Sequence, residues 1–137
     1  MKKLFFLCVM LCGFAILQAQ TKADSLIGKW KYMGAMTSQS VYKADPKWYK
    51  PGKPTPKYEF VEFKAGGKCV RNEKGGKPGN TGYKVNGNEI TLDGITYKIK
   101  SMDAKNLLLY RGFYIINEAN GKEKRIDDEQ VSFIRVK

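Results

Sequence analysis

Hydrophobic and polar residues alternate along the chain in short segments, and no window shows a sustained helical period of 3.6 residues. Glycine, proline and asparagine separate these segments at intervals of about eight to twelve residues, a spacing typical of sandwiches and barrels. The pattern therefore predicts an all-β protein built from antiparallel strands. The one short helical turn that we expect lies over Thr21–Ile27.

About eight strands follow from this alternation, and tight turns join several of them. Asp93-Gly94 and Asn86-Gly87 are strong hairpin signals because these residues tolerate positive φ. We expect strands at Gly28–Met36, Lys57–Lys64, Lys68–Arg71, Thr81–Val85, Glu89–Leu92, Ile95–Ser101, Leu107–Ile116 and Val131–Val136. Such a meander has no helix to cover its sheet, so it predicts closure into an up-and-down barrel, which also removes exposed edges.

Large side chains on the inward face of each expected strand form the first candidate binding site. An eight-stranded barrel is either filled by its side chains or holds one small ligand, and the sequence leaves both possibilities open. Buried tyrosine hydroxyls need partners, which a ligand cavity would supply. Period-two alternation places the following side chains inside: Tyr32, Met36, Tyr58, Phe60, Tyr83, Tyr97, Leu109 and Phe113.

The segment Thr37–Pro56 is expected to be a long loop, and it is the second candidate. It carries the aromatic residues Tyr42, Trp48 and Tyr49 together with four prolines and four lysines. Loops of this length in a compact domain are usually functional or disordered. One interpretation is a lid over the barrel, with aromatic surface and lysines for an anionic head group. The other is a solvated loop whose aromatic side chains pack on the barrel wall.

Residues 1–19 have the features of a secretory signal peptide, and residues 20–137 are expected to form a single domain. Two lysines precede an apolar stretch over Leu4–Leu17, and Ala19 offers a cleavage point before Gln20. The stretch falls short of the roughly 20 residues needed to span a membrane. Leucine precedes both Cys8 and Cys12, which does not suit a lipoprotein signal. We therefore expect an exported protein, periplasmic or extracellular.

The charge is strongly positive, with 25 Lys+Arg against 13 Asp+Glu and a net charge of +12. Cleavage after Ala19 would leave 118 residues with a net charge of +10. Lysine accounts for most of the excess, whereas arginine is the usual choice for bidentate phosphate recognition, so nucleic acid is not the expected partner. The charge either keeps the protein soluble or attracts an anionic surface such as lipopolysaccharide, an acidic glycan or an acidic protein.

Candidate catalytic and metal-binding residues are few. The chain has no histidine, which excludes histidine-based triads and histidine metal ligands. Cys69 is expected to be an inert thiol, and Glu59 and Glu62 fall on opposite faces of a strand, so they make no acid–base pair. Asp127-Asp128-Glu129 lacks the spacing of a calcium loop and is expected to be a charged loop. No enzyme activity, metal or cofactor is predicted.

The strand Leu107–Ile116 is apolar on both faces. If its odd-numbered leucines face inward, the opposite face carries an apolar stripe. An exposed stripe suggests a protein contact or a weak homodimer, although the N-terminal segment can equally cover it. The stripe consists of Leu108, Tyr110, Tyr114 and Ile116.

Two separated features resemble the lipocalin family. Gly28-Lys29-Trp30 opens the first strand after a short helical turn, as the G-x-W motif of lipocalins does, and alternation turns Arg135 inward on the last strand. In lipocalins such an arginine packs over the tryptophan at the closed end of the barrel. The resemblance is to small secreted bacterial lipocalin-like proteins and covers residues 21–137. The chain is shorter than animal lipocalins and lacks their disulfide, which puts a roomy cavity in doubt.

The resemblance implies non-catalytic binding of a small apolar or amphipathic ligand through the open end of the barrel. The alternative is an interaction module with a filled barrel that binds a protein or an anionic glycan. Some bacterial cysteine-protease inhibitors resemble small lipocalin-like barrels, which makes a periplasmic inhibitor a concrete version of that alternative.

Overall fold

The computed structural model describes residues 22–42, 50–52, 54–116 and 124–137. The predicted signal peptide, Trp48, Tyr49 and the expected connection at Asn117–Lys122 lie outside the described residues. Residues 22–26 are helical, as expected, and a 3-10 turn, η1, covers Ala65–Gly67. The strands are β1 (Gly28–Tyr42), β2 (Lys50–Pro51), β3 (Tyr58–Lys64), β4 (Lys68–Glu73), β5 (Gly79–Asn86), β6 (Glu89–Leu92), β7 (Ile95–Met102), β8 (Asn106–Ile116) and β9 (Lys124–Arg135).

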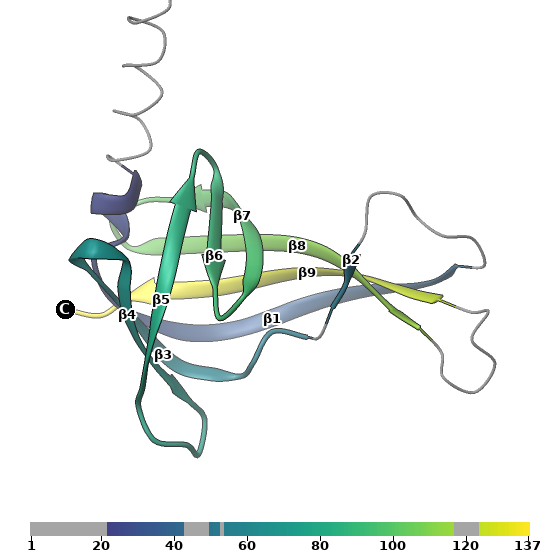
Figure 1. Cartoon of the computed structure of the whole chain (residues 1–137), viewed down its shortest axis with the longest axis horizontal. Coiled ribbons are helices and arrows are strands. Elements are labelled where there is room, and N and C mark those ends of the chain that lie inside the picture. The colour runs from purple at the N-terminus through teal and green to yellow at the C-terminus, as the bar shows by residue number, and fades with distance from the viewer. Residues whose placement is uncertain (1–21, 43–49, 53, 117–123) are drawn as a thin grey trace, which may run out of the picture.

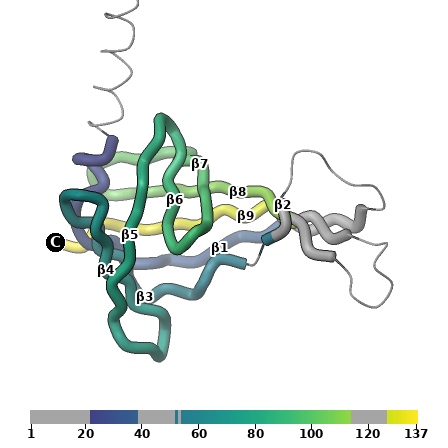
Figure 2. The backbone as a smooth tube through the Cα atoms, in the orientation of Figure 1, coloured from purple at the N-terminus to yellow at the C-terminus, as the bar shows by residue number. Residues whose placement is uncertain are grey.

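The eight longer strands close into an antiparallel up-and-down barrel, which confirms the predicted fold class. Strands β3 to β8 pair in sequence order, β8 pairs with β9, and β9 pairs with β1, which returns to β3 (Figure 1). The two-residue strand β2 adds a parallel pairing to β8. The tube view shows the helical turn at the end of the barrel near the C-terminus (Figure 2).

Tight turns hold the hairpins at the predicted places. Asp93 and Gly94 both have positive φ, 53° and 75°, as a two-residue turn of type I′ requires. In the β5–β6 hairpin, Asn86 pairs with Glu89, so the central residues are Gly87 and Asn88 rather than the expected Asn86-Gly87. The hairpin forms as predicted, with its turn shifted by one residue.

The core follows the period-two alternation over most of the barrel. Successive inward positions of β6, β7 and the start of β8 are almost fully buried, which confirms the predicted faces of these strands. The buried apolar cluster comprises Leu26, Trp30, Tyr58, Val61, Phe63, Cys69, Tyr83, Ile90, Leu92, Tyr97, Ile99, Leu107, Leu109, Val131 and Phe133.

Two β-bulges reverse the alternation and make two predicted inward positions wrong. The β1–β9 register shifts between Tyr32 and Gly34, so that Met36 pairs with Gln130 and lies outside the barrel, 78% exposed. The β3–β4 register shifts between Tyr58 and Phe60, and Phe60 turns outward as well. On the outer face of the sheet, the Lys29 Nζ lies 4.0 Å from the centre of the Phe60 ring. An extra residue in one strand moves every later side chain to the opposite face.

Both strands at the seam of the barrel are longer than predicted. The start of the expected loop, Thr37–Tyr42, continues β1, and the charged triplet Asp127–Glu129 lies inside β9 rather than in a loop. These two segments pair with each other, from Thr37↔Glu129 to Tyr42↔Lys124. Together with the end of β8 they run past the other strands as a three-stranded extension (Figure 1). We call this extension the arm: residues 33–42, 111–116 and 124–130.

The closed end of the barrel is held by the predicted contact between Arg135 and Trp30. The guanidinium carbon lies 4.2 Å from the centre of the tryptophan ring. Arg135 also donates hydrogen bonds to the carbonyl oxygens of Ser25 and Ile27 on one side and of Ala104 on the other. A cation–π contact of this kind contributes up to about 2 kcal/mol when it is shielded from water. The arginine therefore ties the helical turn, β1 and the β7–β8 connection together.

We predict that Gly28→Ala destabilises the protein more than Gly34→Ala does. Both glycines have strongly positive φ, 131° and 144°, so backbone strain is similar. A Cβ at position 28 would lie 2.7 Å from the Arg135 Nη1, whereas a Cβ at position 34 meets no described atom within 4 Å. Displacement of the arginine would break its hydrogen bonds. Urea unfolding should therefore show that Gly28→Ala lowers the free energy of unfolding by about 1 kcal/mol more than Gly34→Ala does. Equal losses would contradict this account.

Candidate functional site

The end of the barrel opposite Trp30, which we call the mouth, is crossed by residues 50–52 and 54–57. Lys50 and Pro51 pair with β8 at Phe113 and Tyr114, and the chain then enters the mouth. A Cβ on Gly52 would lie 2.9 Å from the Cβ of Phe113, so only glycine allows this close approach. Residues 54–57 lead back to β3, and we call residues 50–52 and 54–57 the strap.

Thr55 is the part of the strap that enters the barrel, and it is 7% exposed. Pro54 and Pro56 flank Thr55 and have no N–H group, so Thr55 supplies the backbone hydrogen-bond donor at this point. This N–H donates to the Glu129 Oε1 at 3.2 Å, and the hydroxyl donates to the Oε2 at 2.6 Å. The same hydroxyl lies 2.7 Å from the Tyr97 hydroxyl. A threonine thus fills a polar position inside the mouth.

A buried ion pair lies beneath the strap. The Arg111 Nε donates to the Glu129 Oε2 at 2.9 Å, and the two residues are 8% and 2% exposed. The Arg111 guanidinium also covers the Phe113 ring at 4.1 Å. Burial of two charges costs several kcal/mol per ion before their attraction offsets it. We call Thr55, Tyr97, Arg111 and Glu129 the mouth cluster.

Three aromatic rings pack together in the core next to this cluster, and two of them, Tyr58 and Phe133, are each 3% exposed. The rings of Tyr32, Tyr58 and Phe133 lie 5.7 to 6.4 Å apart, two of the pairs edge to face. Burial raises the pKa of Tyr58 far above its usual value of 10 and raises that of Tyr97 to about 12. Burial and the nearby Glu129 carboxylate raise the pKa of Tyr32. All three tyrosines are therefore neutral hydroxyls at physiological pH.

A second polar contact links the mouth to the β6–β7 turn. The Tyr58 hydroxyl donates to the Asp93 Oδ2 at 3.0 Å, and the Arg71 Nε lies 2.7 Å from the same oxygen. Asp93 lies in the tight turn between β6 and β7, so this contact fixes that turn against β3 and β4. The mouth therefore has ordered polar groups on two sides.

The predicted ligand-binding residues whose side chains the structure describes separate into three groups. Tyr32, Tyr58 and Tyr97 come together at the mouth, as expected for inward positions. Tyr83 points inward near the closed end, where its hydroxyl donates to the Lys64 carbonyl oxygen at 3.0 Å. The outward Met36 and Phe60 are removed from this site by the two bulges. Trp48, Tyr49 and the side chain of Tyr42 lie outside the described residues.

The charged members of the mouth cluster were missed in the sequence, although a signal for them was present. Leu109 and Phe113 were expected to face inward, and Arg111 lies between them with the same parity. Likewise, extension of the last strand upstream of Val131 turns Glu129 inward. Charged residues are rarely buried without a partner, and the pairing of these two supplies that partner.

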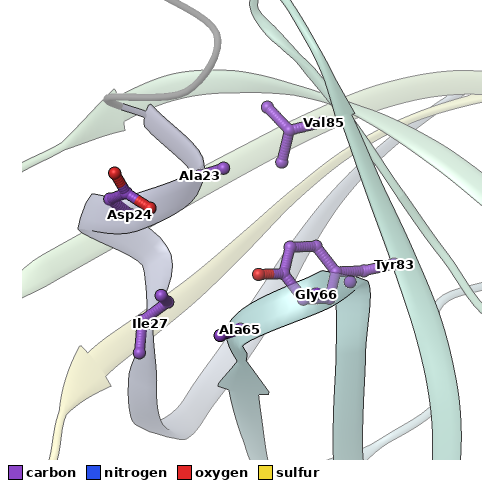
Figure 3. Close-up of a pocket in the computed structure, with 8 residues that line it drawn as sticks. Ala23, Asp24, Ile27, Ala65, Gly66, Tyr83 and Val85 are labelled. Carbon is purple, nitrogen blue, oxygen red and sulfur yellow. The ribbon is translucent and has the colours of Figure 1, made fainter.

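A second cleft lies between the helical turn and the β-strands at the closed end (Figure 3). Its volume is about 230 Å³. Figure 3 shows the Asp24 carboxylate at its edge, and the Tyr83 hydroxyl is already bound to Lys64. The cleft therefore has few polar groups that converge on a ligand, unlike the mouth. Its lining residues are Ala23, Asp24, Ile27, Ala65, Gly66, Gly67, Tyr83 and Val85.

The described part of the chain contains no group of three or more cysteine, aspartate or glutamate residues placed to hold a metal ion. Cys69 is 1% exposed, and burial raises its pKa to about 12. A thiol in this state is a poor nucleophile. None of the described helical residues forms a helix long and apolar enough to cross a membrane.

Comparisons with known proteins give no assignment: no protein-family model, curated protein or solved structure matches this chain. The geometry of the mouth and of the closed end therefore carries the functional argument.

We predict strong energetic coupling between Arg111 and Glu129. Glu129→Gln or Arg111→Met alone leaves one buried charge without its partner and should cost about 3 kcal/mol in the free energy of unfolding. The double variant should cost less than the sum of the two by at least about 1 kcal/mol. The measurement is a double-mutant cycle by urea unfolding.

The exposed pair Lys64–Glu62, at 3.9 Å, is the control and should couple by less than about 0.5 kcal/mol. Equal coupling in both pairs would contradict the conclusion that Arg111 and Glu129 form a buried ion pair.

We also predict that Cys69 resists thiol reagents in the native protein. A pKa raised from 9.0 to about 12 lowers the thiolate fraction at pH 8. By the same reasoning, alkylation by iodoacetamide should be about 1000-fold slower than in the denatured chain. Peptide-resolved mass spectrometry of timed samples measures this ratio at Cys69. A native rate within tenfold of the denatured rate would show that the thiol is accessible.

Proposed function

We propose that the protein is an exported, non-catalytic binding protein of lipocalin-like type that takes a small amphipathic ligand at the mouth of its barrel. The observation that carries the proposal is the mouth cluster, in which Thr55 of the strap satisfies the buried Glu129 and Tyr97. A filled apolar core needs no such group. A closed barrel is compatible with ligand binding, and polar groups at its mouth supply specificity.

The contacts of Thr55 define the chemistry of the ligand head group. Glu129 accepts one N–H and one O–H from this residue, and the Tyr97 hydroxyl adds a further polar contact. A ligand with adjacent hydroxyl, amide or amine groups reproduces these bonds when it displaces the threonine. Because the bonds are exchanged rather than lost, displacement avoids the penalty of an unpaired buried carboxylate.

The aromatic rings of the mouth would receive the apolar part of the ligand. Tyr32, Tyr58 and Phe133 pack against one another beside the cluster, beneath the strap. The strap can give access to these rings because, among the residues that the structure describes, two, Lys50 and Pro51, pair it with β8. Opening therefore breaks few backbone hydrogen bonds.

Absence of catalysis and export are parts of the same proposal. In the mouth, Glu129 is engaged by both Arg111 and Thr55, so its carboxylate is occupied as a hydrogen-bond acceptor. Export rests on Lys2, Lys3 and the apolar stretch Leu4–Leu17, and it brings the protein to the cell envelope, where amphipathic molecules are abundant. The packing of Arg135 over Trp30 supports the lipocalin-like assignment.

We predict that the protein purified from its own cell envelope carries a small molecule in a ratio of one to one. Native mass spectrometry should show the adduct, and denaturation should release it for identification. Addition of 1-monodecanoylglycerol to the emptied protein should give saturable binding in isothermal titration calorimetry. Methyl decanoate lacks hydroxyl groups and should bind at least about tenfold more weakly, because the buried acceptors remain unpaired.

Two variants test the role of the strap. Thr55→Val removes the competing hydroxyl and should tighten 1-monodecanoylglycerol binding by about threefold to tenfold, whereas Thr96→Val on the outer face of β7 should leave it unchanged. Equal affinity for the two lipids, or no binding by either, would overturn the proposed head-group chemistry. A clean mass together with no binding would favour the interaction module with a filled barrel.

A further inference from the structure

Strand β1 is paired along both edges only at its beginning. It pairs with β3 from Gly28 to Lys31 and with β9 from Trp30 to Tyr42. Beyond Lys31, no described strand pairs with its second edge. Within the described residues, the backbone N–H and C=O groups along this edge thus have no strand partner, which is the situation in which a sheet edge can accept another strand.

The same stretch is exposed on both of its faces. Ala35 and Thr37 have the parity of the inward Val131 and Glu129, and Met36 and Ser38 have the opposite parity, yet all four are exposed. Met33, at the bulge, is 55% exposed. This part of β1 is thus held mainly by its pairing with β9.

The sequence of this edge has none of the usual protection against pairing. Charged residues make up 28% of the chain, but residues 32–42 contain no charged residue and no proline. Natural edge strands normally carry lysine, proline or strong bulges that block association. Here the single bulge lies at the base of the stretch and leaves residues 34–42 in regular register with β9. Figure 1 shows that the arm projects away from β3–β7, so the barrels of two molecules need not collide.

We propose that this edge pairs with the same edge of a second copy, so that β1 and its symmetry mate join two arms into one continuous sheet. A two-fold axis perpendicular to the sheet pairs a strand with itself in the antiparallel direction, which is the arrangement that a closed dimer requires. The surface is self-complementary because both partners present the same uncharged edge.

The absence of charge on the edge itself favours a second copy over a charged peptide as the partner. The chain carries a net charge of +12, so two copies repel each other over most orientations. The uncharged edge is where they can approach with little local repulsion, and it offers an acidic or basic peptide no charge to recognise. In the joined sheet, the outward Met36 side chains of the two copies lie on the same face, where their apolar surface is buried.

Sedimentation velocity of the purified protein over a concentration series tests the proposal. We expect a reversible monomer–dimer equilibrium that stays constant or strengthens when NaCl is raised from about 50 to about 500 mM, because salt screens the repulsion. Ser38→Lys should weaken the dimer at least tenfold. Thr91→Lys is the matched control: it adds the same charge on the outward face of β6, at a position paired with Lys84 of β5 and with Thr96 of β7, and should change the dimer less than twofold.

Cysteine cross-linking locates the axis. In a Cys69→Ser background, Met36→Cys, Thr37→Cys and Ser38→Cys place thiols along the edge, and positions next to the axis should form a disulfide-linked dimer under mild oxidation. Thr96→Cys should not. A monomer at all concentrations, or a dimer unaffected by Ser38→Lys and not cross-linked at any of these positions, would overturn the proposal. A dimer that weakens as salt rises would also overturn it, since that behaviour indicates attraction between charged surfaces.

Discussion

The seam between β1 and β9 is the constraint on which the rest of the structure depends. Its register sets Trp30 opposite Arg135, which closes one end of the barrel. One bulge farther along, the same register places Thr37 opposite Glu129 and so turns that carboxylate inward at the other end. A slip of one residue along this seam would expose the arginine and bury the outer face of the arm. The closed end and the mouth are therefore specified by one pairing.

The interior of the barrel divides into an apolar part and a polar part. Around Trp30, Ile90 and Leu107 the side chains are almost fully buried and are held by apolar packing. Toward the mouth, Tyr97 marks the change to hydroxyl groups and then to a charged pair. Apolar packing stabilises the barrel regardless of function, whereas a buried ion pair is weak evidence for stability. This contrast is why we place ligand recognition at the mouth.

The sequence predicted the barrel because it follows from local alternation and short turns, and the resemblance to lipocalins predicted the contact at its closed end. The positive-φ turn at Asp93-Gly94 and the inward parity of Arg135 are visible in the sequence without knowledge of the fold. The wrong positions, Met36 and Phe60, follow β-bulges, which no local pattern announced. The charged triplet at Asp127 was taken for a loop because charge normally marks solvent, and only the opposite strand reveals its partner. In each case the pairing between strands decided which way the side chains face, and the local sequence pattern did not.

The hydrogen bond from Arg135 to the carbonyl oxygen of Ile27 spans 108 residues of sequence, close to the whole described chain. Contacts of such long range slow folding because the chain loses conformational entropy before the contact forms and stabilises the fold. The barrel cannot close until its last strand is available, and any shorter chain retains two open edges. For the export that we propose, slow closure would keep the chain unfolded during passage, and the fold would be completed after the C-terminus had emerged.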